Sequence, residues 1–123
     1  MTANGVTSVS LEPPLALACV GHNRNTYRLI RTTRLFGLSI LAESQRPIAE
    51  YFVRPTAART GDVEIPFDTL GGRWPVITGA IARMGCAVVS EHEAGDHTIF
   101  IARVEEVDTL DARPLVYFRG KYS

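Results

Sequence analysis

Residues 91–104 read EHEAGDHTIFIARV, and the second half of this stretch has the period of two that is typical of a β-strand. Alternate residues would point to opposite faces of that strand: Thr98, Phe100, Ala102 and Val104 to one face, Ile99, Ile101 and Arg103 to the other. Gly95-Asp96 favours a turn, because glycine tolerates positive φ and aspartate bonds its own backbone. His97 would then be the first residue of the strand, either as a hairpin corner bonded to a carboxylate such as Asp96 or as one wall of a site.

The flanking sequence predicts several more strands and few helices. Strands are expected at 6–11, 15–20, 36–41, 86–89, 98–107 and 115–118, helices at 25–31 and 44–52, and a long loop at 53–75. The run LALACV is continuously apolar, which suits a strand buried on both faces, and Asn25, Thr26 and Ser44 are candidate helix N-caps. Short strands without a βαβ rhythm favour an antiparallel barrel or sandwich.

Composition argues against several functional classes. The chain has 123 residues, enough for one domain with its own core, and its 13 basic and 13 acidic residues cancel. A neutral chain gives no electrostatic reason to bind nucleic acid or an anionic membrane, and no apolar run approaches the ~20 residues of a membrane helix. No signal peptide is visible, and Cys19 and Cys86 fit buried free thiols better than a disulfide, so a cytoplasmic location is expected. No Cys/His spacing predicts a metal site.

The loop GHNRNTY, which follows the second predicted strand, carries most of the candidate ligand-binding groups. Backbone N–H groups at a helix start, together with Arg24, Asn25 and Thr26, could hold a phosphate. On the local sequence alone, a solvated loop with an N-cap is favoured over that interpretation. The first predicted strand, VTSVSL, is unusually polar, which fits either an edge strand with one wet face or a groove lined with hydrogen-bonding groups. No glycine-rich nucleotide loop, P-loop or nucleophile elbow is present.

Four segments in the same order resemble the signatures of the flavin reductase-like, FMN-binding split-barrel family. They are TANGVTSVSLEPPLALACV (2–20), HNRNT (22–26), GDHTIFIARV (95–104) and PLVYFRGKY (114–122). The resemblance covers essentially the whole chain and implies one domain, 1–123, that is mainly β: an antiparallel split β-barrel with a few short helices. It also implies an NAD(P)H-dependent flavin reductase, which transfers a hydride from NADH or NADPH to FMN or FAD, often for a partner monooxygenase. The alternative is a non-catalytic flavin-binding module or electron carrier.

The resemblance assigns roles to individual residues. The flavin-binding set that it implies is Ala3, Asn4, Thr7, Ser8, Cys19, Gly21, Asn25 and Thr26, the last two at the phosphate. The nicotinamide-binding set is His97, Arg119 and Tyr122. Hydride transfer needs no side-chain acid or base at the transferring carbon, so no catalytic residue is assigned, and His97 would orient or polarise the nicotinamide.

Two departures from the family pattern bear on stability. Gly5 stands where the family usually has Ser, which removes a hydroxyl and loosens the local backbone. The chain starts at the flavin motif, so it is expected to lack the helix and the first barrel strand that relatives carry ahead of that motif, which would expose a strand edge. The apolar runs LALACV and FGLSIL are more than such a small barrel covers alone, so a homodimer whose interface borders the flavin groove is expected.

Overall fold

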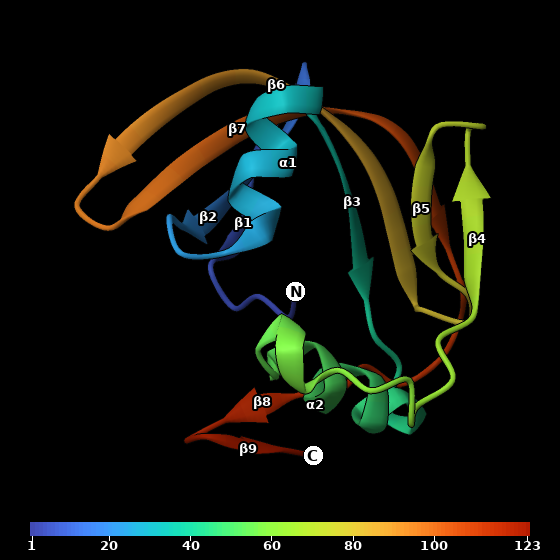
Figure 1. The fold of residues 1–123 in the computed structure, drawn as a ribbon. Helices are drawn as coiled ribbons and strands as arrows, with labels where there is room; N and C mark the ends of the chain where they lie inside the picture. The colour runs from blue at the N-terminus through green and yellow to red at the C-terminus, as the bar shows by residue number, and fades with distance from the viewer.

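The computed structural model describes residues 1–123 and is built around one antiparallel sheet of five strands in the order β1-β2-β7-β6-β3 (Figure 1). These strands are β1 (Val6–Leu11), β2 (Pro14–Gly21), β3 (Leu35–Ile40), β6 (Ala82–Ala94) and β7 (His97–Thr109). The other elements are helices α1 (Asn25–Thr33) and α2 (Arg46–Val53), the 3-10 turns η1 (Glu43–Gln45) and η2 (Thr56–Ala58), and the hairpins β4–β5 (Phe67–Leu70, Trp74–Ile77) and β8–β9 (Tyr117–Phe118, Lys121–Tyr122). The predicted fold class, mainly β and antiparallel with few helices, is confirmed.

Strand β7 carries the predicted period of two into the core, and His97 is its first residue. Thr98, Phe100 and Ala102 are buried, while the residues between them are only half-buried. Phe100 is fully buried in a cluster with Ala18, Val20 and Ile30. Because Ile30 belongs to α1, this helix covers the part of the sheet that lies next to the start of β7 (Figure 1).

The long strands β6 and β7 bend as they cross the molecule. Each has 13 residues, and their pairing shifts register between Gly85 and Cys86 and again between Val88 and Ser90. Such bulges bend a strand and increase its twist. As a result the two strands curve from the β4–β5 hairpin at one end to the far side of α1 at the other (Figure 1).

The region 53–75 was predicted to be a long loop, and this prediction is wrong because it contains a hairpin. Strands β4 and β5 pair antiparallel, and the turn between them uses Gly71 at φ 56° and Gly72 at φ 71°. Residues 71–73 connect Leu70 to Trp74, and positive φ at the first two of them gives a tight turn that the Arg73 N–H closes on the Leu70 carbonyl oxygen at 3.1 Å. Gly71 and Gly72 therefore form a hairpin turn, and Pro75 lies within β5, where it weakens the strand pattern of the sequence.

Trp74 of β5 fixes this hairpin against β6. It is only 3% exposed, and its Nε1 donates a hydrogen bond to the Cys86 carbonyl oxygen at 3.1 Å. A Cβ at Gly85 would lie 2.4 Å from the Trp74 ring, so only glycine leaves room for the indole. Both cysteines are free, as predicted, but only Cys86 is buried, whereas Cys19 is half-buried. Burial raises the pKa of the Cys86 thiol to about 11.

Two details of the helices differ from prediction. The N-cap of α1 is Arg24, whose backbone is extended and whose side chain makes no capping bond, so Asn25 and Thr26 lie inside the helix. Ser44 lies in η1, and α2 begins at Arg46. None of the helices is long and apolar enough to cross a membrane.

Two strand predictions also need correction. The LALACV strand is buried on one face only: Ala16, Ala18 and Val20 are buried, whereas Leu15, Leu17 and Cys19 are half-buried. The predicted last strand, 115–118, shrinks to Tyr117–Phe118, because the backbone of Leu115 bonds Leu41 in a separate connection. The strand predicted at 86–89 is longer in the structure, where β6 runs from Ala82 to Ala94.

A second apolar cluster lies around α2. Its buried members are Ile48, Ile77 and Ala80, and Leu41, Phe52 and Ile65 pack against them. The N-terminal segment Met1–Asn4 passes between α1 and α2 on its way to β1 (Figure 1). This segment is where the candidate site lies.

Candidate functional site

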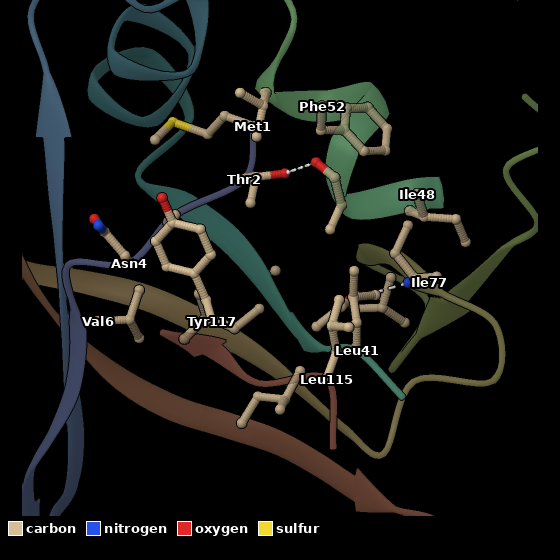
Figure 2. Close-up of a pocket in the computed structure, with 18 of the residues that line it drawn as sticks. Met1, Thr2, Asn4, Val6, Leu41, Ile48, Phe52, Ile77, Leu115 and Tyr117 are labelled. Atoms are coloured by element: carbon tan, nitrogen blue, oxygen red, sulfur yellow. Dashed lines mark hydrogen bonds between the residues drawn. The ribbon is translucent and has the colours of Figure 1, made fainter. Parts of the chain in front are cut away.

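Two neighbouring cavities share the N-terminal segment as a wall. The larger has a volume of about 650 Å³ and the smaller about 500 Å³. Both are lined by the same five residues, Met1, Thr2, Ala3, Asn4 and Arg24. Thr2 fixes the wall to α2, because its Oγ1 donates to the Ala49 carbonyl oxygen at 2.6 Å (Figure 2).

The smaller cavity is polar. Besides the shared wall it is lined by Cys19, Gly21, His22, Asn23, Asp96 and His97. Backbone bonds bring these segments together: the Cys19 N–H donates to the Gly5 carbonyl oxygen at 2.8 Å, and the His22 N–H to the Asp96 carbonyl oxygen at 2.9 Å. A Cβ at Gly5 would lie 3.0 Å from the Cys19 Cβ, so glycine at this position suits the close approach of the N-terminal segment to β2.

The sequence suggested two alternatives for His97, a hairpin corner bonded to Asp96 or one wall of a site, and the structure shows both. Its Nδ1 lies 2.8 Å from Asp96 Oδ1, and it also lines the polar cavity. The hydrogen bond from His97 lowers the pKa of the Asp96 carboxyl. His97 pairs with Gly21 across the sheet, and its Nε2 lies 3.6 Å from where a Gly21 Cβ would stand. A Cβ at Gly21 would make ordinary contact with the His97 ring and would press on Asn23, whose Oδ1 is 3.0 Å from the same point.

The structure adds His22, which sequence reasoning did not single out. Its Nε2 lies 2.9 Å from the hydroxyl of Thr98, and its ring packs against Tyr27 with 4.7 Å between ring centroids. The available signal was the pattern of β7 itself, where a threonine stands first among the core-facing residues and so needs a polar partner. That partner is 76 residues away in sequence, so its identity could not be inferred.

Arg24 lies at the junction of the two cavities. It is half-buried and takes part in none of the ion pairs of the chain, although most other arginines pair with a carboxylate or a carbonyl. A guanidinium cannot lose its charge at ordinary pH. It is therefore a donor that remains available to an anionic group of a ligand in either cavity.

The larger cavity is apolar and lies between β3, α2, β5 and the β8–β9 hairpin (Figure 2). Tyr117 and Tyr122 of the hairpin line it together, with their ring centroids 5.0 Å apart. Burial raises the pKa of Tyr122, and its neighbour Tyr117 adds to the shift. Ile48 and Ile77 of the second apolar cluster also line this cavity, so its floor is continuous with the core.

Several residues predicted for the flavin site meet at the polar cavity. Ala3, Asn4, Cys19 and Gly21 all line it, together with His97 from the predicted nicotinamide set. These residues come from the N-terminal segment, the end of β2 and the start of β7, which the sheet order places side by side. The polar cavity is thus the place where the two predicted sets come together.

The other predicted residues lie elsewhere. Thr7 and Ser8 are exposed on the edge strand β1, and Asn25 donates through Nδ2 to the Thr56 hydroxyl at 3.2 Å. Neither these three residues nor Thr26 and Arg119 line either cavity.

Within the predicted nicotinamide set, Tyr122 lines the apolar cavity rather than the polar one. Arg119 (φ 51°) and Gly120 (φ 76°) form the turn of the β8–β9 hairpin. The Arg119 guanidinium stacks over the Phe118 ring at 5.4 Å. His97 is therefore the only member of this set at the polar cavity.

A donor-lined cavity that opens beside an apolar one suits a ligand with a flat apolar part and a charged polar part. Similarity to known proteins identifies the family of the chain. Residues 1–123 match the flavin reductase like domain. An NADH-dependent flavin reductase from Rhodococcus is 40% identical over 122 residues, which cover 99% of this chain and 67% of that protein. The chain therefore belongs to the flavin reductase-like family.

Two further relatives extend the comparison. The reductase component of 4-nitrophenol 4-monooxygenase/4-nitrocatechol 2-monooxygenase from Rhodococcus opacus is 36% identical over 121 residues, which cover 98% of this chain and 64% of that protein. A solved structure of an NADH:FAD oxidoreductase from Streptomyces globisporus, in complex with NAD and FAD fragments, aligns with a TM-score of 0.90 at 32% identity. It covers 100% of this chain, which in turn covers 74% of that chain. The chain thus spans about two thirds of the length of these two curated relatives.

Proposed function

We propose that the protein is an NAD(P)H-dependent flavin reductase that transfers a hydride from the nicotinamide to FMN or FAD. The observation that carries the proposal is the polar cavity, where Asn4, Cys19 and Gly21 of the flavin motif lie beside His97. Membership of the flavin reductase-like family supports the same activity. In the proposed reaction NAD(P)H gives up a hydride, the flavin takes it up with one proton from solvent, and NAD(P)⁺ and reduced flavin leave.

The residues present fit a flavin. Its isoalloxazine ring is flat and largely apolar, with polar atoms along one edge, whereas its ribityl phosphate is polar and anionic. The wall Met1–Asn4 supplies backbone donors, the larger cavity supplies apolar surface, and Arg24 supplies a cation without a carboxylate partner. When bound, the flavin supplies the hydride-accepting chemistry.

The role proposed for the chain is to bind and orient rather than to transfer protons. Hydride transfer requires the two reacting carbons in contact and water excluded, and no side chain need act as an acid or base there. We assign His97 to the nicotinamide side, because its Nε2 remains free once Nδ1 is bonded to Asp96. The apolar residues Ile48 and Ile77 would exclude water from the larger cavity.

The activity is tested by following NADH absorbance with and without added FMN or FAD. Oxidation of NADH or NADPH that depends on added flavin supports the proposal. A protein that binds flavin and stays yellow but oxidises no nicotinamide is instead a flavin-binding module or electron carrier. Repeating the assay with both nicotinamides and both flavins identifies the preferred pair.

Asn25 and Thr26 are proposed as phosphate ligands at the start of α1, although neither lines the cavities. The double substitution Asn25→Ala/Thr26→Ala removes two donors, each worth roughly 1 kcal/mol, and should weaken FMN binding more than riboflavin binding. Equal weakening of FMN binding and riboflavin binding would show that this loop does not hold the phosphate. Because Asn25 bonds Thr56, the control is Thr56→Ala, which loses only that internal bond.

We further propose a homodimer that borders the larger cavity. Five large apolar side chains that line this cavity remain 38% to 56% exposed, and exposed apolar surface gathered at one cavity supports an interaction surface there. They are Val6, Ile40, Val53, Phe67 and Tyr117. Light scattering at micromolar concentration tests the proposal, and a folded monomer contradicts it.

A partner monooxygenase and a cytoplasmic location complete the proposal. A Rhodococcus opacus relative is itself the reductase component of a monooxygenase, which supports a similar partner here. Two free cysteines fit a reducing compartment. Stimulation of substrate hydroxylation when the protein is added to a candidate oxygenase with NADH and flavin tests the partnership.

A further inference from the structure

Thr98 stands out in the core because it is the single buried polar residue of the chain, at 2% exposed. It follows His97 on β7 and lies on the face that carries Phe100. A hydroxyl in such surroundings is costly unless it is hydrogen-bonded. Its side-chain partner is His22, whose Nε2 lies 2.9 Å from the Thr98 Oγ1.

His22 is itself held in place on three sides. Its ring packs against Tyr27 of α1, with 4.7 Å between ring centroids. Its backbone N–H donates to the Asp96 carbonyl oxygen at 2.9 Å, and its imidazole bonds Thr98. It also lines the polar cavity.

These two bonds flank His97. Asp96 and Thr98 are its immediate neighbours in sequence, and His22 bonds the carbonyl of the first and the hydroxyl of the second. The backbone on both sides of His97 is thereby tied to the loop between β2 and α1. We call the two bonds that His22 makes to Asp96 and Thr98 the clamp. His97 pairs with Gly21, the residue before His22, so its ring lies next to the clamp.

We infer that His22 is a positioning residue: by bonding Thr98 it fixes His97 at the wall of the polar cavity and so sets nicotinamide affinity. This inference rests on the proposed reductase function and on the nicotinamide role proposed there for His97. A side chain that binds a ligand through one hydrogen bond is effective only if its backbone is preorganised. Breaking the clamp should therefore raise the nicotinamide KM and leave flavin binding nearly unchanged.

Three variants separate positioning from stability. His22→Phe keeps a ring against Tyr27 but leaves the Thr98 hydroxyl buried without its partner, so the melting temperature should fall. Thr98→Val removes the hydroxyl at nearly the same volume. In the double variant both polar groups are gone, and the melting temperature should recover toward that of Thr98→Val, because replacing both partners is far less costly than stranding one.

The nicotinamide KM should behave differently from the melting temperature. It should rise by about three- to tenfold in His22→Phe, in Thr98→Val and in the double variant alike, because all three lack the same bond. His22→Gln, whose amide can occupy the place of Nε2, should restore the KM toward the wild-type value. His92→Phe is the matched control, since this exposed histidine of β6 lines neither cavity.

Steady-state kinetics, flavin titration and melting curves on these variants decide the question. A KM that recovers together with the melting temperature in the double variant would show that the bond is only structural and would overturn the inference. An unchanged KM in His22→Phe overturns it as well. If wild-type protein oxidises no NADH with either flavin, the proposed reductase function fails and the role of His22 fails with it. An active wild type with unaffected variants refutes the positioning role alone.

Discussion

Replacing His97 by alanine isolates the contribution of one ring nitrogen to nicotinamide binding. In the folded protein Nδ1 is bonded to Asp96 at 2.8 Å, so only Nε2 remains for a ligand. Losing one hydrogen bond to a bound substrate costs about 1 kcal/mol, or roughly fivefold in kcat/KM. The loss should fall on the KM for NAD(P)H, because the residues proposed to hold the flavin lie in the N-terminal segment, the end of β2 and the start of α1.

The effect of His97→Ala on stability should be small. The His97 side chain is 50% exposed and that of Asp96 is 95% exposed, so the contact between them lies in solvent, where polar pairs contribute little to stability. The expected result is therefore a raised nicotinamide KM with an unchanged melting temperature and an unchanged flavin dissociation constant.

Steady-state kinetics with varied NADH, a flavin titration and a melting curve test this expectation, with the exposed His92→Ala as control. Three outcomes lead to different conclusions. Lower melting temperature with parallel loss of both ligands means that His97 is structural. A strong fall in kcat at constant affinities means that it acts in the hydride-transfer step. An unchanged nicotinamide KM in a folded variant removes His97 from the site and refutes the reasoning.

Three further expectations concern the scaffold. Gly85→Ala should destabilise the protein by about 3 kcal/mol in urea unfolding, because the new Cβ would lie 2.4 Å from the Trp74 ring; wild-type stability in this variant would contradict the packing. The hydrogen bond from Arg54 lowers the pKa of Asp62 to about 2 from 3.8, so this pair stabilises the fold above that ordinary value and loses its effect as pH falls toward 2. As the pH falls from 3.8 toward 2, the melting temperature of Asp62→Asn should therefore fall less than that of the wild type. An equal fall in both proteins would speak against a stabilising pair. Burial raises the pKa of Cys86 to about 11, so the folded protein should keep this thiol unlabelled by iodoacetamide at about pH 8, as mass spectrometry can check; rapid labelling would show that the site opens.

Local patterns in the sequence were sufficient to predict where the strands of the main sheet lie, although not their order or the full length of β6. The alternation from Thr98 to Arg103 is a property of one strand, and the buried face of β7 follows it residue by residue. Gly95 has φ 63°, as the turn before His97 requires. These features depend on neighbours in the chain, so they could be inferred without knowing the fold.

The β4–β5 hairpin was missed for a physical reason. Its strands have four residues each, and Pro75 interrupts the donor pattern that a strand normally offers. Glycine is common both in loops and in hairpin turns, so Gly71 and Gly72 indicate a hairpin only once the pairing of the flanking strands is known. That pairing is stabilised by the burial of Trp74 against Gly85, a contact that no local pattern encodes.

The candidate site was predictable only in part for the same reason. Ala3, Asn4, Cys19, Gly21 and His97 were assigned through family resemblance, and the structure brings them to one cavity. The clamp formed by His22 and Thr98 joins residues 76 apart, and only the sheet order makes them neighbours. Resemblance to a family indicates which residues belong to the site. The hydrogen bonds that position those residues join distant parts of the chain and become visible only in the folded structure.

The segment Met1–Asn4, which lines both cavities, constrains how the proposed reaction could occur. His97 lines the polar cavity and Tyr122 the apolar one, so these two residues of the predicted nicotinamide set belong to different cavities. Donor and acceptor carbons must nevertheless touch for a hydride to pass. The two ligands should therefore meet along this segment, which Thr2 ties to α2 and Gly5 ties to β2. Because the segment is anchored at both ends, it can present its backbone donors to a flavin in a fixed position, which is the preorganisation that hydride transfer without a side-chain acid or base requires.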